Sequence, residues 1–85
     1  MNTNTQALDI SNNHLTSAQL RTFRKFQRRL IERVPDYHIA WVRPFKENII
    51  EVGLEPEKMT YRKNQRAAGA AIEVEDETGI TVILL

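Results

Sequence analysis

Residues 17–34 form the most regular hydrophobic pattern in the chain. When they are placed on a helix at 100° per residue, their apolar side chains fall within an arc of about 140°. This arc contains Leu20, Phe23, Phe26, Leu30, Ile31 and Val34. Lysine and arginine fill most of the remaining circumference, and Glu32 is the only acid of the segment. The pattern predicts an amphipathic helix that docks its apolar side on the rest of the fold and turns a basic side outward.

Both ends of this helix carry sequence signals. Thr16 or Ser17 suits the N-cap, and Gln19 follows Thr16 at the spacing of a capping box. Pro35 cannot continue a helix and disfavours helical geometry at the residue before it. We therefore expect the helix to begin directly after the cap and to end near Arg33.

Two extended segments are expected next. Residues 37–42 are mostly β-branched or aromatic, and residues 48–54 have extended character again. Pro44 is expected to break the first strand, so residues 43–47 are predicted as a hairpin loop with Phe45 at its tip. Alternation along the first strand places on one face Tyr37, Ile39 and Trp41, of which we expect the tryptophan in the core.

Residues 57–68 carry a weaker pattern, with a thin apolar line and a polar middle. Pro56 suits the first position of a helix, and Gly69 suits its end because glycine tolerates left-handed backbone geometry. We interpret this segment as a second helix. The alternative assigns residues 59–63 to a strand and residues 64–69 to a loop.

The last part of the chain is predicted as a second hairpin. Residues 72–75 alternate between apolar and acidic side chains, and residues 76–79 supply turn formers. Residues 80–85 are apolar at nearly every position. The second strand of this hairpin is therefore expected to be buried on both faces, or on one face with a partner.

These elements predict an α+β fold in the order α-β-β-α-β-β. A small antiparallel sheet of about four strands would be covered on one face by the amphipathic helix and the weaker second helix. Residues 1–15 carry one charge, Asp9, and no apolar period, so we expect a mobile polar tail before a single domain at residues 16–85. In the alternative, Leu8 and Ile10 dock as a short extended segment.

Composition restricts the class of protein. A chain of 85 residues holds one domain with a thin margin of stability, and 41% hydrophobic with 27% charged residues is typical of a globular protein. The absence of cysteine excludes disulfides, thiolate zinc sites and thiol catalysis. No apolar run is long enough to span a bilayer and no signal segment opens the chain, so we expect a cytoplasmic location and no membrane partner.

The sequence contains no motif that indicates catalytic chemistry. His14 and His38 have no further ligands at metal-binding spacing, although Asp36 lies two residues before the second histidine. No serine has a histidine and an acid arranged about it, and no glycine-rich loop suits a phosphate. We therefore expect no enzyme, no catalytic residue, no metal, no cofactor and no small-molecule substrate.

Charge distribution suggests where the chain binds, since a formal charge of +1 is too balanced to indicate a nucleic-acid binder by itself. The candidate residues for a polyanion or a partner are Arg21, Arg24, Lys25, Arg28, Arg29 and Arg33. The candidate interface residues are Phe45, Glu73, Glu75 and Glu77. The acidic set and the basic set would complement each other, within one molecule or between copies.

The expected function is therefore a non-enzymatic binding module. It would associate with itself, as a dimer, or with another protein, because a small sheet with a free edge gains stability by pairing across a two-fold axis. The alternative is a small RNA- or DNA-binding protein that uses the basic face of the helix at residues 17–34.

Overall fold

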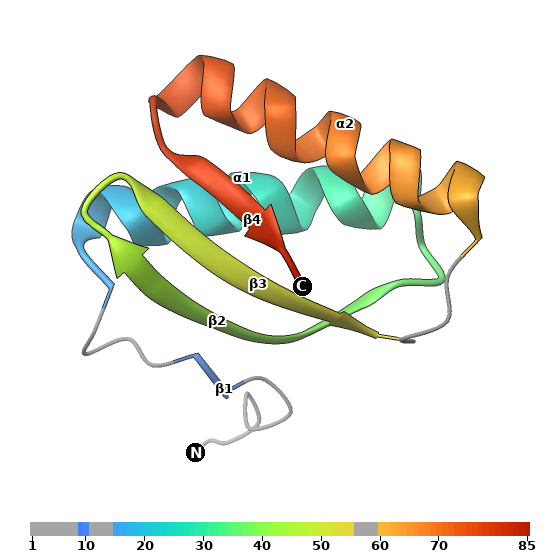
Figure 1. The fold of residues 1–85 in the computed structure, drawn as a ribbon, viewed down its shortest axis with the longest axis horizontal. Coiled ribbons are helices and arrows are strands. Elements are labelled where there is room, and N and C mark those ends of the chain that lie inside the picture. Colours follow the sequence, from blue (N-terminus) through green and yellow to red (C-terminus); the bar gives the residue numbers. More distant parts are fainter. Residues whose placement is uncertain (1–8, 11–14, 56–59) are drawn as a thin grey trace.

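Two helices lie on one side of a small mixed sheet (Figure 1). The computed structural model describes residues 9–10, 15–55 and 60–85 of the chain. The helices are α1 (Ser17–Arg33) and α2 (Tyr61–Thr78). The strands are β1 (Asp9–Ile10), β2 (His38–Lys46), β3 (Ile49–Glu55) and β4 (Thr81–Leu84). The chain thus has a small α+β fold, which the sequence predicts.

The predicted α1 is confirmed at both ends. Thr16 Oγ1 accepts a hydrogen bond from the Gln19 amide at 3.0 Å, and Gln19 Oε1 accepts one from the Thr16 amide at 2.9 Å. These two bonds form the expected capping box. The helix ends at Arg33, two residues before Pro35. Its buried apolar side chains are Phe23, Phe26 and Leu30.

Two residues of α1 differ from the simple helical pattern. Ile31 is exposed, so its predicted place on the docking side is wrong: it lies at the margin of the apolar arc, beyond the part that the sheet covers. Gln19 is buried instead, and its Nε2 donates to the carbonyl oxygens of Lys46 at 2.8 Å and Glu47 at 3.1 Å. This amide ties the start of α1 to the β2–β3 turn.

The β2–β3 hairpin is tighter than predicted. Its turn consists of Glu47 and Asn48, whereas the sequence predicted a loop over residues 43–47. Pro44 and Phe45 lie within β2. Beyond the two residues paired with β1, the outer side of β2 has no strand in the described part of the chain, and the register shifts directly after Pro44. Proline is tolerated in a strand that has an unpaired side and at an irregularity in register, so Pro44 does not break β2.

A second register shift, between Ile39 and Trp41, changes which side chains face the helices. Ile39 pairs with Leu54 and packs against the core, whereas Trp41 pairs with Gly53. Ala40 has no partner in this register, so the alternation slips by one residue. The expected placement of Trp41 in the core is therefore wrong: it is half-buried on the face of the sheet away from the helices.

The second predicted hairpin is also wrong, because residues 72–75 and most of the predicted turn belong to α2. The buried side chains of this helix recur at helical spacing: Ala67, Ala70, Ala71 and Val74. Gly69 lies inside the helix, and Gly79 ends it with φ 78° in the left-handed region. Thr60 is the N-cap, and the expected start at Pro56 lies outside the described residues.

The sheet is mixed and has three long strands instead of about four antiparallel ones. β2 and β3 are antiparallel, and β4 lies parallel to β3, with α2 as the crossover that a parallel connection needs. β1 adds two residues, parallel to β2, at the opposite edge. Most of the expected tail, residues 1–8 and 11–14, lies outside the described residues.

The core lies between the helices and the sheet. Phe23, Phe26 and Leu30 of α1 and the small residues of α2 meet the side chains that the sheet directs toward them. The sheet contributes Val42, Ile50, Val52, Leu54 and Val82. α1 packs against β2 and β3, whereas α2 packs against α1 and the edge strand β4. This division leaves different surfaces of the two helices exposed.

Candidate functional site

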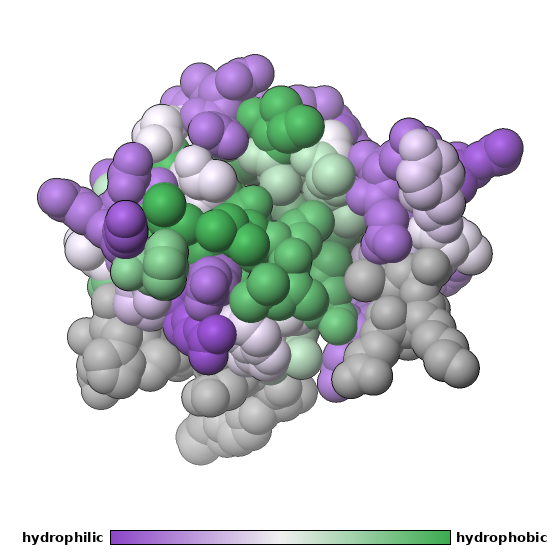
Figure 2. All heavy atoms as spheres, viewed as in Figure 1, coloured by the Kyte–Doolittle hydropathy of each residue, from purple (hydrophilic) through white to green (hydrophobic). Residues whose placement is uncertain are grey.

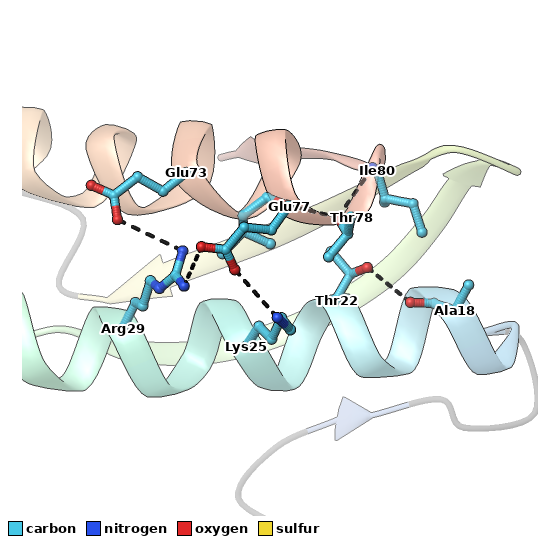
Figure 3. Close-up of polar contacts among 9 residues, drawn as sticks. Ala18, Thr22, Lys25, Arg29, Glu73, Glu77, Thr78 and Ile80 are labelled. Carbon is cyan, nitrogen blue, oxygen red and sulfur yellow. Dashed lines mark hydrogen bonds and ion pairs between the residues drawn. The ribbon is translucent and has the colours of Figure 1, made fainter.

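Three of the six basic residues of α1 face α2. Lys25, Arg29 and Arg33 follow one another at intervals of four residues, and Glu73 and Glu77 have the same interval on α2. Because four residues is close to one helical turn, each set lies along one side of its helix. The helices run antiparallel, so the two sets meet in an ion-pair ladder, and Figure 3 shows the contacts that Lys25 and Arg29 make in it.

The ladder is continuous along the contact between the helices. Lys25 Nζ lies 3.3 Å from Glu77 Oε1, and Arg29 bridges both glutamates. Arg33 donates to Glu73 Oε1 at the far end. Arg29 Nη1 makes no hydrogen bond within the described chain and lies 3.7 Å from Glu73 Oε1, which is within ion-pair range. The acidic and basic sets are thus complementary within one molecule.

The ladder lowers the pKa of both glutamates. A hydrogen bond from Arg33 holds the pKa of Glu73 below its ordinary value, and hydrogen bonds from Arg29 and then Lys25 do the same for Glu77. The pKa of Arg33 is raised in turn by its hydrogen bond to Glu73. Arg29 is the most buried of the five side chains, at 25% exposed, and the other four are more open to solvent, so screening by water keeps the stabilisation from each pair small.

The other three basic residues of α1 form an arginine stripe, consisting of Arg21, Arg24 and Arg28. All three are exposed, and none makes an ion pair with a residue in the described part of the chain. Arg24 and Arg28 also line an open hollow with Gln27 and Ile31. The structure therefore divides the basic face into a half that pairs with the glutamates of α2 and a half without an ion pair among the described residues.

The candidate interface residues do not lie together. Glu73 and Glu77 belong to the ladder, whereas Glu75 lies on another side of α2 and accepts a hydrogen bond from Thr81 Oγ1 at 3.1 Å. The sequence pattern predicted Glu73 and Glu75 on one side of a strand, and the helix places them on different sides of α2. Phe45 is exposed near the end of β2, with Lys46 Nζ 5.7 Å from its ring centroid.

The sequence pattern missed an exposed apolar stripe on α2, which we call the α2 stripe. It consists of Tyr61, Ala68 and Ile72. These residues are separated by seven and four positions, so they share one line along the helix. The signal was present in the sequence but was hidden by the assignment of residues 72–75 to a strand. Recognising the helical spacing of Ala67, Ala70 and Val74 would have revealed it.

Metal and membrane sites were also searched for within the described residues. No group of three or more His, Cys, Asp or Glu side chains there is arranged to hold a metal ion. His38 is exposed, and Asp36 pairs with Lys63, whose hydrogen bond lowers the pKa of the aspartate. Neither of the two helices has the length and apolar character that crossing a membrane requires.

The division of charge on α1 and the α2 stripe are the features of this surface that suggest a partner. Comparison of the chain with models of protein families, with curated proteins and with solved structures gives no match.

Proposed function

We propose that this chain is a non-enzymatic interaction module that associates with a second copy of itself through the outer face of α2. The observation that carries this proposal is the α2 stripe, in which Tyr61 is 77% exposed and Ile72 is 59% exposed. α2 lies at the periphery of the fold, so this face is accessible (Figure 1). Gln65 lies between Tyr61 and Ala68 on this line and donates to the Tyr61 hydroxyl, so the apolar contact is concentrated at Ala68 and Ile72. Exposed apolar side chains aligned on one helix face of a small protein favour a protein partner.

The stripe is suited to two-fold symmetry. Most soluble homo-oligomers are closed dimers in which the same patch of each copy meets its counterpart. Ala68 and Ile72 lie on either side of the midpoint of α2, which spans Tyr61–Thr78. In an antiparallel pair of α2 helices, Ile72 of one copy therefore meets the small Ala68 of the other. Such a contact of a large with a small side chain lets two helices approach closely.

The charges of α2 support the same antiparallel arrangement. Arg62 near the start of the helix and Asp76 near its end are exposed on the same flank of the α2 stripe, at 100° per residue. A two-fold axis across the middle of the helix brings each half opposite the other half of the second copy. Opposite charges then meet at both ends of the contact, which favours this orientation over a parallel one.

Sedimentation equilibrium over a range of protein concentrations tests the proposal. We expect wild type to associate reversibly, and Ile72→Glu to weaken association by at least about tenfold, because it places a charge in the apolar contact. Ile31→Glu is the matched control, because Ile31 is 58% exposed on α1. A wild type that stays monomeric at the highest attainable concentration, or equal effects of the two variants, would refute the dimer.

A charge-reversal series tests the orientation. Arg62→Glu places a like charge opposite Asp76 of the second copy and should weaken the dimer. Adding Asp76→Lys to this variant should restore association. A series in which the double variant associates no better than Arg62→Glu alone would contradict the antiparallel contact.

A second candidate function is nucleic-acid binding by the arginine stripe. The observation that favours it is that Arg21, Arg24 and Arg28 stay exposed and outside the ion-pair ladder. Residues 21 to 28 span about 10 Å of helix axis, and duplex DNA presents a phosphate on each strand every 3.4 Å or so. Arginine is also the side chain best shaped to bind a phosphate through two donors.

Binding of a labelled duplex DNA at several salt concentrations tests this second candidate. Three phosphate contacts predict a slope of log K against log salt of about −2 to −3. Arg24→Ala combined with Arg28→Ala should reduce that slope by about 2, whereas Arg43→Ala with Lys46→Ala, an equal loss of charge on the hairpin, should not. Absent binding, or binding that does not depend on salt, removes this candidate.

A further inference from the structure

Two hollows on α1 lie apart from the surface proposed for self-association. That surface carries the α2 stripe, and Figure 2 shows an apolar patch near it, over β4 and the flank of α2. The two hollows share Gln27 and Ile31 as bordering residues. Their other borders in the described chain are residues of α1 and residues 37–39, where β2 begins. A partner could therefore occupy them without contacting α2.

The hollows adjoin along one flank of α1. The first has a volume of about 330 Å³ and is bordered by Arg24, Gln27, Arg28 and Ile31. Positions three, four and seven residues apart lie on the same side of a helix. The second hollow, of about 110 Å³, adds to the border Leu30, Tyr37, His38 and Ile39. One surface, which we call the α1 flank site, thus extends from two arginines to a group of apolar side chains.

Ile31 is the exposed apolar side chain of this site. Its exposed fraction is 58%, and it borders both hollows. β1 pairs with β2 only at Trp41 and Val42, so no strand of the described chain lies beside Ile39 on the outer side of β2. Because Ile31 and Ile39 border the same hollow, the apolar end of the site lies at this open part of the sheet. A partner that covers Ile31 would remove apolar area from water, which favours binding.

The opposite end of the site is positively charged. Arg24 and Arg28 are about one helical turn apart, and both border the first hollow. Neither makes an ion pair with a described residue, including Glu32, the acid of the same helix. A carboxylate of a partner is complementary to this pair, because guanidinium groups hold carboxylates through several N–H donors. The site thus combines an anion-binding end with an apolar end.

We propose that the α1 flank site binds an extended acidic segment of a partner protein, in which an acidic residue lies two positions from an apolar one. The midpoint between Arg24 and Arg28 is five residues from Ile31, which corresponds to about 7.5 Å along a helix. Residues i and i+2 of an extended segment are about 6.6–6.8 Å apart and point to the same side. A carboxylate can therefore contact the arginines while the apolar side chain covers Ile31.

The apolar end distinguishes this occupant from nucleic acid. A phosphate backbone would contact the arginine stripe and leave Ile31 in water. A small molecule is less suited, because such ligands are mostly enclosed by their sites and both hollows are open to solvent. The α2 stripe takes no part in this site, so the proposal does not rest on the dimer.

A capped synthetic peptide, Ser-Glu-Ser-Glu-Ser-Leu-Ser, titrated into the protein labelled with ¹⁵N tests the proposal. Its glutamates and leucine occupy alternate positions, so they share one side of an extended chain. We expect shifts of the Gln27 side-chain amide and of the backbone amides near Ile31 and Ile39. The control peptide, Ser-Glu-Ser-Glu-Leu-Ser-Ser, has the same composition with the leucine moved by one position. It should bind at least about fivefold more weakly, because its leucine points away from the side of the glutamates.

Protein variants test the two ends of the site. Ile31→Ser should weaken binding of the alternating peptide about fivefold or more, whereas Ile72→Ser, at a position of α2 that is 59% exposed, should not. Arg24→Ala combined with Arg28→Ala should weaken binding at least about tenfold. Arg43→Ala with Lys46→Ala, an equal loss of charge on the hairpin, should have little effect.

The proposal is overturned if the alternating peptide does not bind, if the control peptide binds equally well, or if the shifted amides lie outside residues 24–39. Binding that depends on the arginines but not on Ile31 would also overturn it, because the site would then be only a surface for anions. Duplex DNA that binds the wild type should bind Ile31→Ser equally well, which separates this site from the nucleic-acid candidate. Sedimentation of the wild type without peptide reports on self-association independently.

Discussion

The indole ring of Trp41 occupies the space that a side chain on Gly53 would need. The two residues face each other across the β2–β3 ladder, and a Cβ on Gly53 would come within 2.7 Å of Trp41 Cζ2 and closer still to Cε2 and Nε1. The guanidinium of Arg43 lies over the same ring, with Cζ 4.7 Å from its centroid, and pairs with Glu51 on β3. Glycine at position 53 therefore lets the tryptophan lie flat on the open face of the sheet.

Gly53→Ala should destabilise the fold by about 1–3 kcal/mol, because the added methyl group forces the ring or the backbone to move. Gly69→Ala is the matched control: its Cβ would meet only Arg33 Nη1, at 3.9 Å, and alanine is the better helix former. Urea unfolding should therefore show that glycine-to-alanine substitution lowers the free energy of unfolding at position 53 and raises it at position 69. In a Trp41→Ala background the cost of Gly53→Ala should largely disappear, and an unchanged cost would contradict the steric explanation.

Gly79→Ala tests backbone conformation without any steric contact. Gly79 ends α2 at φ 78°, and nothing lies within 4 Å of the position of its Cβ. An alanine there would be destabilising only because of the left-handed backbone conformation, by about 1–2 kcal/mol. Gly79→Asn should cost less than Gly79→Ala, since asparagine tolerates this region better. Thermal unfolding compares the two variants, and a lower unfolding temperature for Gly79→Asn than for Gly79→Ala would contradict the explanation from backbone conformation.

The parts of the fold that the sequence predicted correctly depend on local signals. The capping pair of Thr16 and Gln19, the periodicity of α1 and the position of Pro35 all lie within one segment, so they define its boundaries without the rest of the chain. The same reasoning failed for Ile31. It lies on α1 but is exposed, because the side of a helix that is covered depends on the width of the layer beneath it.

The error at α2 has a different physical origin. Alternation over residues 72–75 fits a strand as well as a helix, and only the longer series of Ala67, Ala70, Ala71 and Val74 distinguishes them. Alanine contributes little hydrophobicity, so the buried side of α2 gave a weak signal although it packs closely against α1. The ion-pair ladder depended on this assignment, because Glu73 and Glu77 face α1 only if their spacing is that of a helix turn.

The ladder predicts how stability depends on pH. The pKa values of Glu73 and Glu77 are lowered in the folded state from an ordinary value of 4.5. Their contribution is therefore complete above about pH 4.5 and is lost as the pH falls through the lowered folded-state pKa values. Glu77→Gln should be less stable than wild type at pH 7, and the two should converge as the pH falls below the lowered folded-state pKa of Glu77.

Glu75→Gln is the control for the ladder, because it removes the same charge from the same helix outside these pairs. Its effect on urea unfolding should be smaller than that of Glu77→Gln at pH 7. High salt should narrow the difference between the two variants, since exposed pairs are screened. A Glu77→Gln variant with the same pH profile as wild type would show that the ladder does not stabilise the fold.

The buried amide of Gln19 should be the most sensitive polar group of α1. It accepts from the Thr16 amide and donates to the carbonyl oxygens of Lys46 and Glu47. Gln19→Met keeps the size of the side chain and leaves these backbone groups without partners, so we expect a loss of about 1–3 kcal/mol. Gln27→Met, at a half-exposed position of the same helix, should change stability by no more than about 0.5 kcal/mol.

Gln19→Glu separates hydrogen bonding from packing at the same site. The introduced carboxylate has no proton to donate at pH 7 and faces two carbonyl oxygens, so its ionised form is disfavoured and its pKa is raised in the folded state. A raised carboxyl pKa means that stability relative to wild type recovers as the pH falls through it, because the protonated acid can donate again. The stability of Gln19→Glu relative to wild type therefore rises as the pH falls, whereas the contribution of the ion-pair ladder decreases. Urea unfolding of wild type and Gln19→Glu between pH 7 and pH 4 measures this dependence. If the difference in free energy of unfolding stays constant over this range, the hydrogen bonds to the two carbonyl oxygens do not account for the contribution of Gln19.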